Sequence, residues 1–388
     1  MIWLYWISGT VLATLWSISV IQSAIHAHEL ADLTRPEWEV PGGTALPSLT
    51  IVVPARNEEA DVGPALESLL RLNYPAYDVV AVNDRSTDRT GEIMERIAAT
   101  APDGRVKVLH IKELPPQWLG KAHAMWLAAR QTESEWILFT DADCVFHPES
   151  MRRALGYTRK NKIDHLVLFP DMHMQTWGEQ MMISFPAVMG GFGFHRYWKI
   201  KDPNAKDHIG VGAFNLIRRQ AYNAVGSYEK LRMEVVDDLK LGEAVKQAGL
   251  RQDVVFGPEL VRLRWGRGAA GIIRNLEKNI FAFLKYRISL VLALCFVLFF
   301  LAVWPFAGLV LAPGWARAGF AVAVAMIAAS YMGVSRHMET SPLLFFLCPI
   351  SAVLLMVATL RSAFLALRDN AVTWRGTKYS LEELRRGS

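Results

Sequence analysis

The sequence predicts an α/β fold with a mostly parallel sheet, in a chain that also enters a membrane. Apolar, often β-branched runs alternate with helix-like segments, and polar or acidic residues follow these runs directly. Long apolar segments at the two ends of the chain indicate the membrane part. Strand and helix alternation is typical of parallel sheets covered by helices, and such sheets bind ligands at the carboxyl ends of their strands.

The alternation runs from residue 49 to residue 139. The expected strands are residues 49–53, 79–82, 106–111 and 136–139, and the expected helices are residues 61–72, 91–99 and 121–130. Looser patterns further along predict strands at 166–169, 210–217 and 254–256 and a helix at 235–247. The helical segments carry apolar residues at spacings of three and four, whereas the strands are short continuous apolar runs.

Composition limits the classes of protein to consider. The chain has 388 residues, of which 52% are hydrophobic, and a formal charge of +5. No basic stripe interleaved with aromatic residues occurs in the middle of the chain, so we expect no nucleic-acid partner and attribute the basic excess to anionic lipid headgroups. The three cysteines, Cys144, Cys295 and Cys348, form neither a disulfide framework nor a zinc pattern.

The apolar segments predict how the chain is organised around the membrane. Residues 1–27 contain no Asp, Glu, Lys or Arg, so we expect an uncleaved anchor; a signal peptide is the alternative, but no basic segment precedes the apolar run. We expect a linker at 28–48, a catalytic domain at 49–268, an interfacial amphipathic helix at 269–287, membrane segments at 288–366 and a basic tail at 367–388. Within 288–366 the expected spans are 288–312, 319–334 and 343–360, the second being short.

The topology is ambiguous at this stage. One anchor and three later spans would put the tail opposite the catalytic domain, whereas the basic tail favours the cytoplasmic side. We expect an integral protein of the cell (inner) membrane with its catalytic domain in the cytoplasm.

The acidic pair at the end of the 136–139 run is the first candidate site. Asp141 and Asp143 place two carboxylates where an α/β sheet binds its ligand. Hard oxygen ligands of this kind suit Mg²⁺ or Mn²⁺ carrying a diphosphate. Taken alone the pair is weak evidence of a metal site, because Asp-x-Asp also occurs in ordinary loops and helix caps.

A nucleoside diphosphate at this edge would give the neighbouring loops separate roles. The segment that ends the first strand would surround the base and ribose through Pro54, Ala55, Asn57 and Glu58. Asp84 would accept a hydrogen bond from the base or ribose, and Lys121 would add positive charge beside the departing diphosphate.

Group transfer also needs a base, and the candidates are Asp237 and Asp238 at the start of the 235–247 helix. The alternative is that these carboxylates only stabilise the helix N-terminus. Arg264 and Trp265 could clamp phosphate and stack on a sugar, or could anchor the chain at the membrane interface. Gly212 and Ala213 could form a small-residue floor under an acceptor, or merely a tight strand.

Together these motifs resemble the family 2 glycosyltransferases of the GT-A fold, over residues 49–265. The resemblance rests on Pro54-Ala55-Arg56-Asn57-Glu58, Asn83-Asp84, Gly120-Lys121, Asp141-Ala142-Asp143, Gly212-Ala213-Phe214 and Asp237-Asp238 in this order. Residues 117–124 and the tail segment 373–379 are similar to those of membrane-bound carotenoid-acid (diaponeurosporenoate) glucosyltransferases, with hopanoid-associated and ceramide glycosyltransferases as further relatives.

The resemblance implies an inverting transfer of one sugar from a nucleotide-sugar, a UDP-sugar above all, to a membrane lipid of carotenoid, terpenoid or sphingolipid kind. Asp238 would be the base, Asp141 and Asp143 would hold Mg²⁺ or Mn²⁺, and Asp237 stands where relatives often carry Glu. Gly212, Ala213, Arg264 and Trp265 would lie on the acceptor side. Val261 stands where processive polysaccharide synthases have Gln, which counts against a polymerase.

Three alternatives stay open from sequence. A polyprenyl-phosphate acceptor would bring its own anionic nucleophile and would need no strong base. A membrane-tethered binder of nucleotide-sugars would show no turnover, and a nucleotidyltransferase would release pyrophosphate.

Overall fold

The computed structural model describes residues 2–190 and 196–387; residues 1, 191–195 and 388, which fall within the expected anchor, catalytic domain and tail, lie outside the described residues. The chain forms two compact units. One unit comprises residues 30–173, 197–264 and the tail from 373, and we call it the catalytic unit. The other comprises the N-terminal segment to 29, residues 174–196 and residues 265–372, and we call it the membrane unit.

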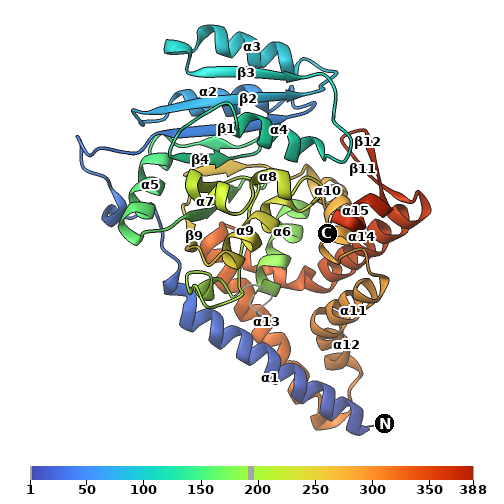
Figure 1. The fold of residues 1–388 in the computed structure, drawn as a ribbon. Helices are drawn as coiled ribbons and strands as arrows, with labels where there is room; N and C mark the ends of the chain where they lie inside the picture. The colour runs from blue at the N-terminus through green and yellow to red at the C-terminus, as the bar shows by residue number, and fades with distance from the viewer. Residues whose placement is uncertain (1, 191–195, 388) are drawn as a thin grey trace. The chain divides into compact units, whose positions relative to one another are not determined.

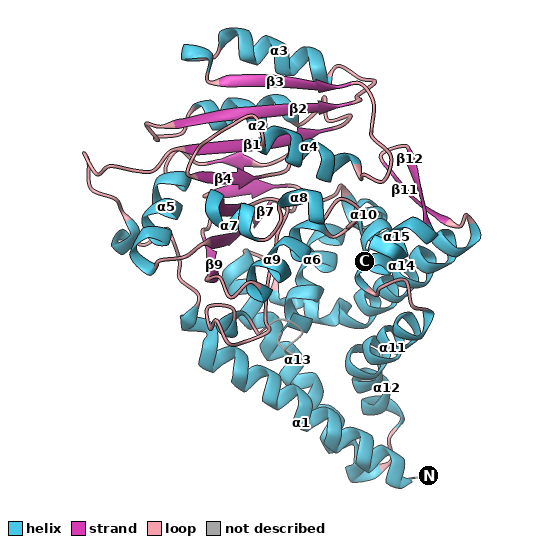
Figure 2. Ribbon diagram, in the orientation of Figure 1, coloured by secondary structure: helices cyan, strands magenta, loops and turns pink. Residues whose placement is uncertain are grey.

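The catalytic unit is built on a seven-stranded sheet with the order β3-β2-β1-β4-β8-β6-β9 (Figure 2). Its strands are β1 (Leu49–Ala55), β2 (Tyr77–Asp84), β3 (Val106–Ile111), β4 (Trp136–Phe139), β6 (His165–Phe169), β8 (Asn215–Arg218) and β9 (Gln252–Phe256). Only β8 runs antiparallel to its neighbours, β4 and β6. The expected α/β fold with a mostly parallel sheet is confirmed.

Helices cover this sheet (Figure 1). They are α2 (Val62–Leu70), α3 (Thr90–Thr100), α4 (Gly120–Ala129), α5 (Ser150–Asn161), α7 (Arg219–Ala224), α8 (Ser227–Lys230) and α9 (Asp237–Gln247). The central strand β4 is buried along its whole length, and α4 packs on β1 and β2. The apolar runs therefore form the core, and the polar residues that follow them are left at the carboxyl edge.

Two smaller sheets complete the unit. One has the order β5-β10-β7, with β5 (Val145–Phe146), β10 (Val261–Leu263) and β7 (Asp171–Met172). The other is a hairpin of β11 (Ala371–Trp374) and β12 (Thr377–Ser380), followed by α15 (Leu381–Gly387). From Thr373 onward the expected basic tail is thus folded, and it belongs to the catalytic unit.

The strand expected at 210–217 is wrong in extent. The structure has a strand only at Asn215–Arg218, and residues 210–214 form a loop. A side-chain Cβ on Gly210 would collide with the backbone of Asp238. Gly210 therefore serves close approach to the start of α9, not sheet pairing.

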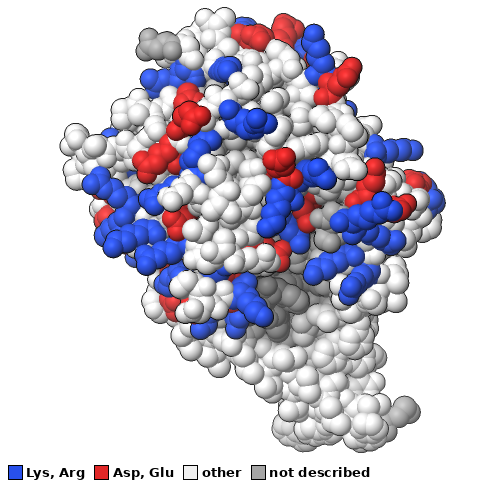
Figure 3. Space-filling model, in the orientation of Figure 1, with Lys and Arg blue, Asp and Glu red and all other residues white. Residues whose placement is uncertain are grey.

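The membrane unit contains α1 (Ile2–His26), α6 (Trp177–Gly190), α10 (Gly268–Phe283), α11 (Ile288–Leu298), α12 (Trp304–Leu311), α13 (Arg317–Met338) and α14 (Cys348–Arg368). A π-helical turn, Phe299–Val303, joins α11 to α12. Four segments of the described chain are long and apolar enough to cross a membrane: Ile2–Glu29, Ile288–Leu311, Gly314–Met338 and Pro342–Arg368. In Figure 3 the surface of α1 and α11–α13 on the face drawn is almost free of charged side chains.

Two boundaries differ from expectation. The second C-terminal span is not short, because the helix begins at Arg317 and continues past Arg336 to Met338. Residues 174–196, inside the segment expected to be catalytic, cluster with the membrane helices instead. Here α6 packs against α10, α13 and α14.

The close approach of the Ile209 backbone to Gly242 in α9 predicts that a larger residue at position 242 will lower stability. A Cβ there would collide with the carbonyl of Ile209, whose backbone is also hydrogen bonded at both its N–H and its C=O by the buried Gln252 amide. We expect Gly242→Ala to destabilise the protein by about 1–3 kcal/mol, because α9 must shift away. Thermal unfolding would measure this against Gly42→Ala, where the added Cβ meets no atom within 4 Å. Equal unfolding temperatures would contradict this packing.

Candidate functional site

The acidic pair lies directly after the buried strand β4, on a loop that the sheet holds in place. Thr140 donates from its backbone N–H to Val52 O, at 3.1 Å. Its hydroxyl donates to Ala213 O, at 2.8 Å. The buried Thr140 thus connects the loop of Asp141 and Asp143 to β1 on one side and to the glycine-rich loop 210–214 on the other.

Lys121 reaches the first carboxylate of the pair. Its Nζ lies 2.6 Å from Asp141 Oδ1, and it comes from the first turn of α4. Burial acts to lower the pKa of Lys121, but attraction to Asp141, Asp237 and Asp238 outweighs burial and raises it. Lys121 therefore stays charged among these carboxylates.

Asp143 is crowded by negative charge. Burial, together with the nearby carboxylates of Asp141 and Glu58, raises its pKa to about 7. Repulsion of this kind among carboxylates is relieved when a cation binds between them. Asp143 and Asp141 thus present an electrostatic environment suited to a divalent ion.

The described residues contain no cluster of three or more His, Cys, Asp or Glu side chains able to hold a metal ion. Asp141 and Asp143 could supply two oxygen ligands. Magnesium-type ions are commonly bound by one or two carboxylates, with water and substrate phosphate oxygens completing the octahedron. The acidic pair therefore fits a metal that arrives with a phosphorylated ligand, and does not fit a metal enclosed by protein alone.

Gly212 brings the acidic pair and the start of α9 together. A Cβ on Gly212 would lie 2.6 Å from Asp141 Oδ2 and 3.2 Å from Lys121 Nζ. The Gly212 N–H and the Leu239 N–H, the latter at 2.8 Å, both donate to the Asp238 carboxylate. Small residues in this loop thus allow two acidic loops to share one site.

Asp237 is buried and Asp238 is half-buried beside this junction. Burial is the main cause that raises the pKa of both carboxyl groups, to about 7 for Asp237, while Lys121 opposes the shift. Asp237 Oδ2 has no hydrogen-bond partner among the described residues. An orphaned buried oxygen costs free energy unless a ligand satisfies it, which favours a binding role over simple stabilisation of the helix N-terminus.

The loops after β1 and β2 are hydrogen bonded to each other. Asn57 adopts a left-handed conformation, its Oδ1 accepts from Thr87 N at 2.8 Å, and its N–H donates to Ser86 Oγ at 3.1 Å. The Glu58 N–H donates to Thr90 Oγ1 at 2.8 Å. These bonds fix the segment of Pro54, Ala55, Asn57 and Glu58, which was expected to surround a nucleoside.

Asp84 makes protein hydrogen bonds that the sequence did not predict. Its two oxygens accept from Arg85 Nε and Nη2, at 2.7 and 3.0 Å. A Cβ on Gly120 would collide with the same carboxylate, so glycine is required where α4 begins. Asp84 therefore joins the end of β2 to the N-terminus of α4.

Sequence reasoning missed the tail at this site. Arg375 pairs with Glu58, Arg56 Nη1 donates to Thr377 Oγ1 at 2.8 Å, and the Gly120 N–H donates to Tyr379 Oη at 3.2 Å. The only sequence signal is the similarity of segment 373–379 to relatives, which supports the family resemblance and indicates no contact. The charge of the tail predicts only that it lies on the cytoplasmic side.

Arg264 and Trp265 lie where the chain passes from one unit to the other. Arg264 follows β10, which pairs antiparallel with β5 so that Arg262 is opposite Val145. After β10 the chain therefore continues toward Asp143, which lies just before β5. Trp265 belongs to the membrane unit, where its carbonyl accepts from Asn275 Nδ2. Their acceptor-side role stays a prediction.

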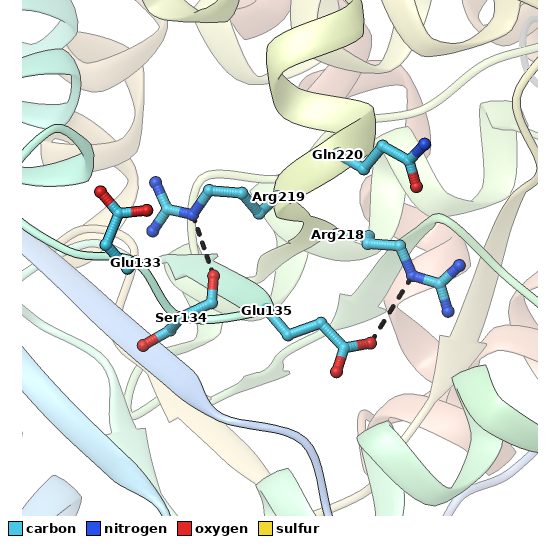
Figure 4. Close-up of a pocket in the computed structure, with 6 residues that line it drawn as sticks. All are labelled: Glu133, Ser134, Glu135, Arg218, Arg219 and Gln220. Atoms are coloured by element: carbon cyan, nitrogen blue, oxygen red, sulfur yellow. Dashed lines mark hydrogen bonds and ion pairs between the residues drawn. The ribbon is translucent and has the colours of Figure 1, made fainter.

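A separate pocket lies at the opposite end of β4 (Figure 4). Its lining residues are Glu133, Ser134, Glu135, Arg218, Arg219 and Gln220. The Arg219 guanidinium donates to Ser134 O, Ala129 O and Thr132 Oγ1, so its donors are used in holding the chain before β4. This pocket precedes the strand, whereas the acidic pair follows it, and we assign it a structural role.

Comparison with known proteins agrees with this geometry. Residues 50–226 match the family described as "Glycosyl transferase family 2". The 4,4'-diaponeurosporenoate glycosyltransferase of Staphylococcus aureus (strain USA300) is 26% identical over 233 residues, which are 56% of each protein. That of strain bovine RF122 / ET3-1 is 26% identical over 226 residues, 54% of each. The chain thus spans about half the length of the curated relatives it matches.

A solved structure shares the fold. The mannosyltransferase PcManGT from Pyrobaculum calidifontis, in complex with GDP-Man and Mn²⁺, superposes with a TM-score of 0.52 at 20% identity, covering 92% of this chain and 99% of that one. At this identity the likeness establishes the GT-A fold and no more.

Proposed function

Residues 50–226 of this chain are a family 2 glycosyltransferase domain, and on that premise we propose that the protein transfers one sugar, with inversion, from a UDP-sugar to a membrane lipid acceptor. The observation that carries the proposal is the junction at Gly212, where the Asp141–Lys121 pair meets the Asp238 carboxylate. One side of this junction suits a diphosphate leaving group and the other suits an acceptor. A glycosyltransferase needs the leaving group and the acceptor within reach of the same sugar carbon atom, the one that is transferred.

The donor would bind along the carboxyl edge of β1, β2 and β4. Glu58 and Asp84 would bind the nucleoside, and Lys121 would place a fixed positive charge beside the phosphates. Mg²⁺ or Mn²⁺ held by Asp141 and Asp143 would neutralise the diphosphate as it leaves. Support for metal use comes from the crowded carboxylates and from PcManGT, which was solved with Mn²⁺.

Asp238 would remove the proton of the acceptor. Two N–H donors orient its carboxylate, and burial raises its pKa, which makes it a stronger base than an exposed Asp. A base on the face opposite the leaving group gives in-line displacement, and hence inversion. Asp237 would contribute its unpaired oxygen to the acceptor hydroxyl or carboxyl group.

The acceptor would be an apolar lipid bearing a hydroxyl or carboxyl group, of carotenoid, terpenoid or sphingolipid kind. The matched relatives are named as diaponeurosporenoate glycosyltransferases. In this chain α10 buries Ile272, Ile280 and Phe281, while Glu277 on the same helix pairs with Arg361 of α14. A helix with apolar and charged sides next to membrane segments is typical of the interface plane, where a lipid acceptor is concentrated.

The contacts within the membrane unit suggest how its segments cross. Tyr5 of α1 stacks on Trp304 and meets Phe320 edge-on, so the start of α1, α12 and the start of α13 share one end. At the other end of α13, the Thr340 hydroxyl lies 3.4 Å from the hydroxyl of Ser184 in α6. The segments Ile288–Leu311 and Gly314–Met338 would therefore be two complete, opposite crossings.

The third apolar segment behaves differently. Cys348, where α14 begins, contacts Ala302, which lies midway along the first crossing. Ser362, later in α14, accepts from Phe281 N, just before that crossing starts. The segment Pro342–Arg368 would thus enter to mid-depth and return to the same side. Two crossings and one re-entrant segment put the tail beside the catalytic domain, as its contacts with Arg56 and Glu58 require.

The charges flanking these segments favour a cytoplasmic catalytic domain in the cell (inner) membrane. Lys285, Arg287, Arg336, Arg361 and Arg368 lie at or near those ends of the apolar segments that would face the cytoplasm. On the far side, the described segments carry only Arg317. Cytoplasmic loops carry the excess of Lys and Arg in most membrane proteins.

Loss of the proposed base gives the first functional prediction. We expect Asp238→Asn to lower sugar transfer by at least about 100-fold while UDP binding stays within about twofold, because an amide cannot take the acceptor proton. Glu243→Gln on the same helix is the matched control and should keep full turnover. Substantial activity in Asp238→Asn would favour a polyprenyl-phosphate acceptor, whose nucleophile is already ionised.

Calorimetry of the detergent-solubilised protein tests the donor site. We expect UDP to bind more tightly with Mn²⁺ than without it, and Asp143→Ala to remove this difference, since one of two protein ligands is lost. Asp61→Asn, an exposed carboxylate near the cluster, should retain the metal effect. Metal-independent binding in the wild-type protein would refute the metal role of the acidic pair.

Labelling of single cysteines in intact cells tests the topology. A membrane-impermeant maleimide should label Pro313→Cys from outside and should label Lys378→Cys only after permeabilisation. The unmodified protein, with its native cysteines in buried or apolar positions, is the control. Labelling of Lys378→Cys from outside would mean that the third segment crosses completely.

A further inference from the structure

We propose that the C-terminal hairpin, residues 371–380, is a wall of the donor site in which Arg375 positions the Glu58 carboxylate for the nucleoside. This inference rests on the proposed function, because it concerns the donor of that reaction. Arg375 is a positioning residue in this view, since it acts through Glu58.

The hairpin contacts the donor edge at three successive points. Arg375 at its turn pairs with Glu58 and also donates from Nη1 to Arg56 O, at 3.1 Å. Thr377 accepts from Arg56 and Tyr379 accepts from Gly120 N, so alternate residues of β12 bond to the loop after β1 and to the start of α4. Residues i and i+2 share one face of a strand, and this face is directed at the donor edge.

The turn itself supports a functional role for Arg375. Arg375 and Gly376 both have positive φ, 47° and 77°, as the two-residue turn of a tight hairpin requires. Asn, Asp or Gly are the usual residues at the first of these positions, and Arg is unfavourable there. The bonds of its guanidinium to Glu58 and Arg56 hold the strained residue, so the sequence keeps Arg for these contacts and not for the turn.

Glu58 needs such a partner. Its side chain is 17% exposed, with the carboxylates of Asp61 and Asp141 nearby. Burial raises the pKa of Glu58, and the charge of Arg375 is the leading opposing cause. With Arg375 in place, one oxygen of Glu58 is oriented by the guanidinium, and the other can accept a hydrogen bond from a nucleoside hydroxyl or N–H. The Arg375 side chain itself remains 45% exposed.

The test compares UMP and UDP binding to the full-length protein in detergent with Mn²⁺, by calorimetry. We expect Arg375→Ala to weaken both nucleotides by the same factor, at least about tenfold, because Glu58 meets the part that UMP and UDP share. Arg375→Lys should recover part of the loss, since an ammonium can bind one carboxylate oxygen. Lys378→Ala, an exposed residue of the same hairpin, should bind like wild type and serves as the matched control.

A double-mutant cycle separates positioning from general damage. In the Glu58→Gln background, Arg375→Ala should have little further effect on UMP affinity, because the interaction through which it acts is already gone. Loss of the fold would instead add to the effect of Glu58→Gln, and the thermal unfolding temperature of each variant would report it. Partial recovery by Arg375→Lys keeps the test informative even if Arg375→Ala folds poorly.

The outcomes are distinct. Wild-type affinity in Arg375→Ala, or an undiminished effect of this change in the Glu58→Gln background, would overturn the inference and leave the proposed function intact. A loss for UDP that clearly exceeds the loss for UMP would also overturn it, because Arg375 would then bind phosphate directly. A wild-type protein that binds neither UDP nor GDP would overturn the proposed function, and this inference with it.

Discussion

The site depends on keeping several carboxylates close together in a poorly hydrated part of the catalytic unit. Asp141 and Asp143 follow the buried strand β4, and Asp237 and Asp238 open α9 on the other side of Gly212. Burial, together with repulsion from neighbouring carboxylates, raises the pKa of Asp143 and Asp237 to about 7, and Lys121 opposes the shift at Asp237. Because Lys121 comes from α4 and the carboxylates from two different loops, the positions of these elements are coupled through charge. A phosphorylated ligand that carried its own cation would enter a site that already favours positive charge between its acidic groups.

Much of the fold could be predicted from the sequence, because strong local signals agreed with the tertiary structure. The strands at 106–111 and 136–139 have the predicted bounds, and β1, β2, α2 and α4 differ by a few residues at their ends. The inner strands β1 and β4 are buried almost throughout, so apolar residues persist along them, whereas the edge strand β3 exposes Lys107 and His110. The strand predicted at 210–217 is wrong in extent because Gly210, which packs closely against Asp238, and Gly212, which packs against Asp141, look in sequence like glycines in a strand. Hydrophobic periodicity and composition do not reveal which backbone segment will pack against a given glycine.

The sequence predicted those site residues that directly follow a strand. Asp141 and Lys121 meet because parallel strands deliver the segments that follow them to one edge. Gly212 reaches the same edge because it precedes the antiparallel strand β8, and its N–H binds Asp238. The tail was not predictable in this way. Arg375, Thr377 and Tyr379 lie more than 300 residues after Glu58, in a segment whose charge predicts only the side of the membrane on which it lies. Likewise, hydropathy identified the third apolar segment. Hydropathy reports the length and composition of a segment, but not the depth in the membrane at which its helix begins.

The tail also gives the donor edge a short covalent connection to the membrane unit. α14 ends at Arg368 and β11 begins at Ala371, so only Asp369 and Asn370 lie between a membrane helix and the hairpin. Two residues span at most about 7 Å when fully extended. The tip of the hairpin, held by Glu58 and Arg56, therefore cannot move far unless the end of α14 moves or these bonds break. The same geometry explains why a segment with the composition of a surface tail is folded as part of the catalytic unit.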